Sequence, residues 1–146
     1  MKNNLIIIFI CLFFIPSTSN AEIYEFNVSK IKIEGNGNLV KAKNGTVNSK
    51  EKGLEITAKI FVYNKEQNKL AANDGFVIVK DENYKIYFEN INIQNSILKA
   101  SNGIKIEDLE NSLNIESETL VVDRNQNILT ASNGIKIEDL ENSLNI

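Results

Sequence analysis

The chain has 146 residues, of which 42% are hydrophobic, 24% charged and 8% aromatic, and its formal charge is −3. This composition indicates one small folded domain, neither disordered nor membrane-spanning throughout. There is no His or Trp, and the single Cys, Met and Pro all lie within the first sixteen residues. Catalysis by a histidine base or a cysteine nucleophile and a Cys/His metal site are therefore excluded. We expect no enzymatic activity, no metal and no cofactor.

Residues 1–21 have the pattern of a secretory signal peptide. Lys2 supplies a positive charge, an apolar run of eleven residues extends from Leu5 to Ile15, and Ser19-Asn20-Ala21 is a small-x-small cleavage site. A retained membrane anchor is the alternative, but eleven apolar residues are fewer than the roughly 20 that cross the hydrocarbon core. We therefore predict cleavage after Ala21 and a mature domain at residues 22–146.

Removal of 21 residues from 146 leaves a mature segment of 125, with 15 basic and 19 acidic side chains and no Cys. An acidic chain without a basic run is a poor nucleic-acid binder, so we expect no nucleic-acid partner. Because no disulfide can form, the order of the domain must come from backbone pairing and an aliphatic core.

Apolar residues of the mature segment recur with a period of two, which is typical of strands with one dry and one wet face. The longest run comprises Leu54, Ile56, Ala58, Ile60 and Val62. Shorter runs of the same kind comprise Leu98 with Ala100, Ile104 with Ile106, and Leu129 with Ala131.

Internal repetition is the strongest signal in the chain. Residues 97–115 and 128–146 differ only at Lys99 against Thr130, and weaker copies lie at 38–45 and 68–75. The aligned glycines, Gly45, Gly75, Gly103 and Gly134, are 30, 28 and 31 residues apart. This spacing predicts repeated strand pairs, with two strands in each repeat.

An Asn-Gly or Asp-Gly pair marks each copy, and such pairs favour tight turns between strands because they tolerate positive φ. We predict such turns at Asn44-Gly45, Asp74-Gly75, Asn102-Gly103 and Asn133-Gly134, and a fifth at Asn36-Gly37.

The segment IEDLENSLNI (106–115) has apolar spacings of three and four that also fit a short helix. Its length and its β-branched, Asn-rich surroundings favour strand, turn, strand instead, with Glu107, Asp108 and Glu110 in a turn. A calcium site is the alternative for these carboxylates, but they lack the glycine and the ligand spacing of a calcium loop, which favours a solvated turn.

Two units, FVYNKEQNKLAANDGFVIV (61–79) and LVVDRNQNILTASNGIKI (120–137), share a pattern with Leu-x-Ala-x-x-Gly at its centre. With the signal peptide and the repeat length, this pattern resembles the organic-solvent-tolerance-like (OstA-like) domain. That family comprises the lipopolysaccharide transport protein LptA, the periplasmic domain of LptC and the N-terminal domain of LptD. The resemblance covers roughly residues 28–146.

The resemblance implies an all-β fold, an open, V-shaped and solenoid-like β-jelly roll of repeated antiparallel strands. It implies a periplasmic module whose apolar groove shields the acyl chains of lipopolysaccharide on the way to the outer membrane. Its partners would be other transport proteins or further copies of itself, joined edge to edge by β-strand addition. The end of the chain within a copied strand leaves open an LptA-like protein or a truncated LptD-like one.

The alternating pattern alone does not separate a closed core from an open groove, and the resemblance implies the groove. The candidate lining residues are Ile56, Ala58, Ile60, Leu70, Ile78, Leu98, Ala100, Ile104, Ile106, Leu129 and Ala131. Lys32, Lys41 and Lys43 are candidates for lipid-phosphate contacts, although ordinary surface lysines fit them equally well. An exported structural or adhesive β-solenoid without bound lipid is the alternative function.

Overall fold

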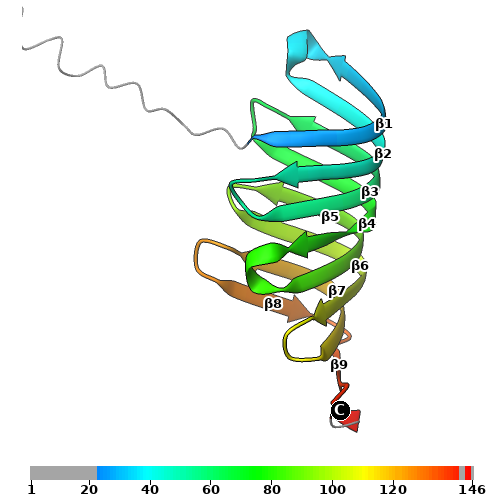
Figure 1. The fold of residues 1–146 in the computed structure, drawn as a ribbon, viewed down its shortest axis with the longest axis vertical. Helices are drawn as coiled ribbons and strands as arrows, with labels where there is room; N and C mark the ends of the chain where they lie inside the picture. Colours follow the sequence, from blue (N-terminus) through cyan, green and yellow to red (C-terminus); the bar gives the residue numbers. More distant parts are fainter. Residues whose placement is uncertain (1–22, 142–143, 146) are drawn as a thin grey trace, which may run out of the picture.

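The computed structural model describes residues 23–141 and 144–145, which form a single antiparallel sheet (Figure 1). Seven long strands follow one another through it: β1 (Tyr24–Glu34), β2 (Leu39–Ser49), β3 (Leu54–Asn64), β4 (Lys69–Val79), β5 (Tyr84–Gln94), β6 (Ile97–Asp108) and β7 (Leu113–Asp123). Three short strands complete it: β8 (Ile128–Ser132) and β9 (Lys136–Asp139) both pair with β7, and β10 (Leu144–Asn145) pairs with β9.

Two single-turn 3-10 helices, η1 (Gly35–Gly37) and η2 (Lys80–Glu82), are the helical elements of the described part of the chain. The predicted all-β fold of repeated antiparallel strands is thus confirmed. No helix within residues 23–141 is long and apolar enough to cross a membrane. The predicted signal peptide at 1–21 lies outside the described residues.

Each long strand bends near its middle, and the bends lie side by side across the sheet. The pairing register divides the sheet at these bends into two halves. Half-sheet A contains residues 24–28, 45–49, 54–58, 75–79, 84–88, 104–108, 113–117 and 136–139. Half-sheet B contains residues 30–34, 39–43, 60–64, 69–73, 90–94, 97–101, 119–123 and 128–132. The strand order begins with β1 and ends with β10, and β8 pairs with β7 beside this path. Because β1 pairs with neither β8 nor β10, the sheet is open (Figure 1).

Left-handed backbone at Asn44, Asp74 and Asn102, with φ of 51°, 55° and 63°, lies at the bends of β2, β4 and β6. The predicted positive φ is therefore confirmed, but the predicted turns between strands are wrong at these three sites. The neighbouring strands bend at the same level, so pairing resumes beyond each bend and the strand continues. Asn133-Gly134 separates β8 from β9, and Asn36-Gly37 does connect two strands, β1 and β2.

The glycine spacings follow from strand and turn lengths. The first five strands begin at residues 24, 39, 54, 69 and 84, because each strand has 11 residues and each connection has four. A two-residue hairpin at Asn95-Ser96, with φ of 51° and 64°, replaces one four-residue connection and gives the interval of 28. A bulge in β6 adds one residue and gives the interval of 31.

The segment 106–115 forms strand, turn, strand, as predicted, and the helical alternative is wrong. Glu110 lies in the turn, but Glu107 and Asp108 do not, because β6 stays paired with β7 as far as Asp108. Asp108 ends β6, and its Oδ1 accepts hydrogen bonds from the backbone N–H groups of Glu110 and Asn111 at 3.0 and 2.9 Å. Asp123 caps the turn after β7 in the same way. These carboxylates therefore hold turns closed by satisfying backbone donors.

Gly75 permits the close approach of β4 to β3 at the bend, because a Cβ there would lie 1.9 Å from the carbonyl oxygen of Thr57. We predict that Gly75→Ala lowers the free energy of unfolding by about 3 kcal/mol, since the strands must separate to admit the methyl group. Gly35→Ala is the control, because that site has positive φ but open space around it. It should cost about 1 kcal/mol. Equal costs in urea unfolding would contradict the close-approach argument.

Candidate functional site

The inner faces of the two half-sheets pack against each other and form one aliphatic interior. In half-sheet A, Val47, Ile56, Val77, Ile86 and Ile106 are adjacent across five strands, and all are fully buried. Facing them, half-sheet B supplies a similar row: Ala42, Phe61, Ala72, Ile91, Ala100 and Leu120. An edge-to-face contact between Tyr24 and Tyr63, with ring centroids 4.9 Å apart, joins the halves near β1.

The bend shifts the phase of the alternation, so that two successive residues point outward there. In β3, Ala58 is buried, Lys59 and Ile60 are exposed, and Phe61 is buried again. Ile60, 43% exposed, therefore lies on the outer face rather than in the interior, and the inward assignment of Val62 is wrong for the same reason. Ile78 also lies on the outer face, between the buried Val77 and Val79.

The other nine predicted lining residues lie on the inner face. Seven of them are buried, and these are Ile56, Ala58, Leu70, Leu98, Ala100, Ile104 and Ile106. Leu129 and Ala131 are half-buried, because β8 is the last strand of half-sheet B. The centre of the interior is thus filled by side chains rather than hollow.

The interior is exposed to solvent at both ends of the sheet. On β1, the inward-facing Ile31 and Ile33 are 50% and 60% exposed, because no strand lies beyond β1 in the described residues. At the opposite end, Ile137 continues the row of Ile106 and Ile115 and is 38% exposed. Sequence periodicity in β1 could have identified Ile31 and Ile33, which the candidate list lacks.

Between these ends, the turns of the two half-sheets approach each other along a rim opposite the bends. Lys52 Nζ donates a hydrogen bond to Ser96 Oγ across it, and Arg124 Nη2 lies 3.8 Å from Asp81 Oδ2. A cavity of about 570 Å³ opens at the rim and reaches the inner-face residues Tyr84 and Leu129. The rim is therefore bridged by polar contacts, whereas the ends carry apolar residues.

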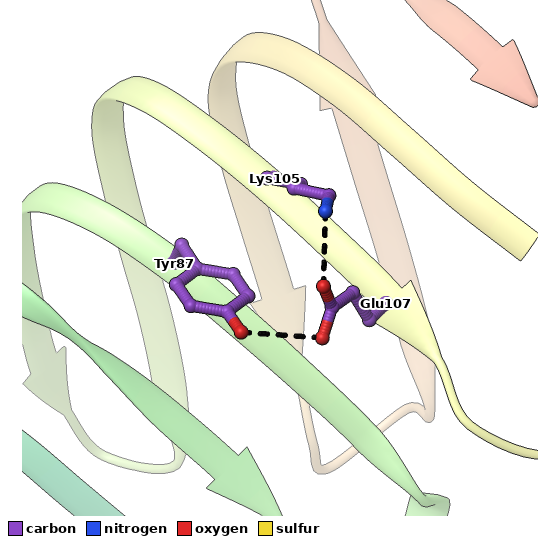
Figure 2. A network of polar contacts seen from close by, with 3 residues as sticks. All are labelled: Tyr87, Lys105 and Glu107. Carbon is purple, nitrogen blue, oxygen red and sulfur yellow. Dashed lines mark hydrogen bonds and ion pairs between the residues drawn. The ribbon is translucent and has the colours of Figure 1, made fainter.

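The outer face of half-sheet A carries a polar network (Figure 2). Glu107 accepts hydrogen bonds from Lys105 Nζ at 3.0 Å and from the Tyr87 hydroxyl at 3.3 Å. The hydrogen bond from Lys105 lowers the pKa of Glu107, and that from Tyr87 adds to the effect. The same bond to Glu107 raises the pKa of Lys105. Each group thus holds the other in its charged form on a solvent-facing sheet surface.

The described residues contain no group of three or more His, Cys, Asp or Glu side chains arranged to hold a metal ion. Of the three residues that the sequence offered as a possible calcium site, Glu107 and Asp108 accept hydrogen bonds through their carboxylates, whereas Glu110 donates its backbone N–H to Asp108. Their contacts are those of strand and turn stabilisation.

No family model and no curated protein matches the chain in sequence. Among solved structures, it is similar to LptH from Pseudomonas aeruginosa, with a TM-score of 0.67 and 11% sequence identity. The two chains share a fold. The match covers 77% of this chain and 84% of LptH, which is described as the LptA-homologous periplasmic component of the lipopolysaccharide transport device. The open antiparallel sheet is therefore an LptA-like β-jelly roll.

Ile106 and Ile137 occupy the same place in two nearly identical sequence copies, but their exposed fractions are 1% and 38%. We predict that Ile106→Ala lowers the free energy of unfolding by about 2–5 kcal/mol, because it leaves a cavity. Ile137→Ala should cost less than about 1 kcal/mol, because water already reaches the site. Urea unfolding of the two variants measures the difference, and similar losses would mean that the second end is closed.

Glu107 predicts a pH dependence of stability. Its folded-state pKa is lowered, so its contribution is present above the unfolded pKa of about 4.3 and is lost as pH falls through the folded value. We expect Glu107→Gln to lower the melting temperature at pH 7 and to lose this effect as the pH falls through the folded-state pKa of Glu107. Glu89→Gln, at an exposed bend, is the control and should change little over this pH range. If the melting temperature of Glu107→Gln stays below that of the unmodified protein at low pH, the effect does not come from the ion pair with Lys105.

Proposed function

We propose that the chain is a non-enzymatic periplasmic module that binds lipopolysaccharide and passes it toward the outer membrane. The observation that carries the proposal is the aliphatic interior, which runs the length of the sheet and is exposed at both ends. The fold shared with LptH, a periplasmic component of a lipopolysaccharide transport device, supports this choice of ligand. The predicted signal peptide supports the location.

Acyl chains bind first at the exposed ends, in this proposal, because the centre is already filled. Ile31 and Ile33 at one end, and Leu129, Ala131 and Ile137 at the other, offer aliphatic surface in contact with water. Each methylene group that leaves water there gains about 0.8 kcal/mol. The buried residues between the ends extend the site if the half-sheets separate along the rim, where a few polar contacts bridge them.

Strand addition along β1 joins the module to its partners, which are other transport proteins or further copies of itself. Among the described residues, β1 pairs with β2 on one side and with no strand on the other. An eleven-residue edge strand offers unpaired backbone donors and acceptors to a second chain. A partner strand there would also cover Ile31 and Ile33 and so continue the apolar interior from one module into the next.

Site-specific photo-crosslinking tests the ligand. A photoreactive side chain replaces Ile33, Ile137 or Ile78 in residues 22–146, which include all the described strands, and the folded proteins are irradiated with lipopolysaccharide. We expect lipopolysaccharide adducts at the inward-facing Ile33 and Ile137. Ile78 is the matched control, because it is the same residue type on the outer face and should give no adduct.

Absence of adducts at both inward positions in folded protein would contradict lipopolysaccharide binding and favour the alternative of a structural or adhesive solenoid. Equal adducts at all three positions would indicate unspecific association. A protein adduct at position 33 would place a partner chain beside β1.

A further inference from the structure

The outer faces of the two half-sheets differ in charge. In half-sheet A, the outward-facing positions carry three lysines and five glutamates, which are Glu25, Glu55, Glu107, Glu116 and Glu138. In half-sheet B, they carry only two carboxylates, Glu34 and Asp123, beside six lysines: Lys30, Lys32, Lys41, Lys43, Lys69 and Lys99. An acidic domain therefore presents one basic face.

Four of these lysines gather on β1 and β2 as two like-charged cross-strand pairs. Lys30 lies opposite Lys43, and Lys32 lies opposite Lys41. Such pairs destabilise a sheet, so their presence needs a compensating anion. Glu34 lies 2.7 Å from the Nζ atoms of both Lys32 and Lys41, and the hydrogen bonds from these lysines lower its pKa to about 2. Among the described residues, Lys30 and Lys43 have no ion pair, and the cluster retains three uncompensated positive charges.

Aliphatic side chains lie on the same face. Ile60 is the cross-strand neighbour of Lys43, and Val62 is the neighbour of Lys41. Together with the four lysines they line a shallow hollow of about 300 Å³. Val121, farther along this face, is also exposed. Lysines interspersed with exposed aliphatic residues are typical of surfaces that lie in the headgroup region of a membrane.

We infer that the outer face of half-sheet B docks onto the phosphate-bearing headgroups of an anionic lipid bilayer. The lysines meet the phosphates, while Ile60 and Val62 contact the upper parts of the acyl chains. An acidic protein segment would match the charge alone, whereas the exposed aliphatic residues among the lysines favour the bilayer. This site is separate from the proposed interior, because it lies on the opposite side of the sheet.

Vesicle sedimentation tests the inference with residues 22–146, which leave out the apolar segment at 5–15. The vesicles contain phosphatidylcholine alone or with 30% phosphatidylglycerol. We expect binding to the anionic vesicles only, weakened by 0.5 M salt. Lys30→Gln with Lys43→Gln should lower the partition coefficient about 25-fold, at about fivefold per lysine. Ile60→Ser should lower it several-fold.

The control is Lys105→Gln with Lys136→Gln, which removes the same charge from the outer face of half-sheet A and should retain binding. Because the Lys30 and Lys43 changes relieve a like-charge pair, their variant should melt at the same or a higher temperature, so lost binding cannot be attributed to unfolding. Equal losses in both double variants, or no binding of the unmodified protein, would overturn the inference. Binding to polyglutamate but not to vesicles would also overturn it and would indicate an acidic protein partner.

Discussion

The bend in the middle of each strand is the constraint on which the rest of the structure depends. Without it, strands of 11 residues in this order would form one extended sheet with a single apolar face in water. The bend turns that face onto itself, so one set of aliphatic residues packs against another from the same strands. Asn44, Asp74 and Asn102 supply left-handed backbone at alternate bends, which few other residue types adopt at low cost. The bends of neighbouring strands must also lie at the same level of the sheet. Because a left-handed residue occurs at the bend of every second strand, the sequence repeats with a period of two strands.

The repeated strands, their period of two and their number per repeat could be predicted from the sequence, because each is a local property. The location of the bends could not, because Asn-Gly favours positive φ in a hairpin and in a bent strand alike. Only the pairing partners decide between these two structures. Because of this ambiguity, Ile60 was predicted to face the interior, whereas it lies on the outer face. Alternation that is extended through a bend assigns every later residue of the strand to the wrong face. The sequence signal for the bend in β3 was the spacing of three residues between the apolar Ala58 and Phe61, where an unbent strand has a spacing of two.

The abundance of Asn, to which composition alone gave no role, has a structural explanation. The last residue of most connections has positive φ, and Asn occupies this position at 68, 83 and 127. Asn64, Asp108 and Asp123 end strands and cap the following turns with their side-chain oxygens. Asn and Asp are thus required by the frequency of turns in a sheet whose strands are all joined by short connections.

The two nearly identical copies, 97–115 and 128–146, show which properties depend on the local sequence and which depend on the position in the sheet. Asn102-Gly103 and Asn133-Gly134 have nearly the same φ, with 63° and 57° against 64° and 58°, so identical residues adopt the same left-handed conformation. Burial differs nonetheless, because β6 lies between two long strands, whereas β8 pairs only with β7, and β9 lies between β7 and the two-residue β10. The exposure of the apolar residues at the ends is therefore determined by the position of their strands in the sheet and not by the local sequence. In the proposed function, a further strand or an apolar ligand covers these ends.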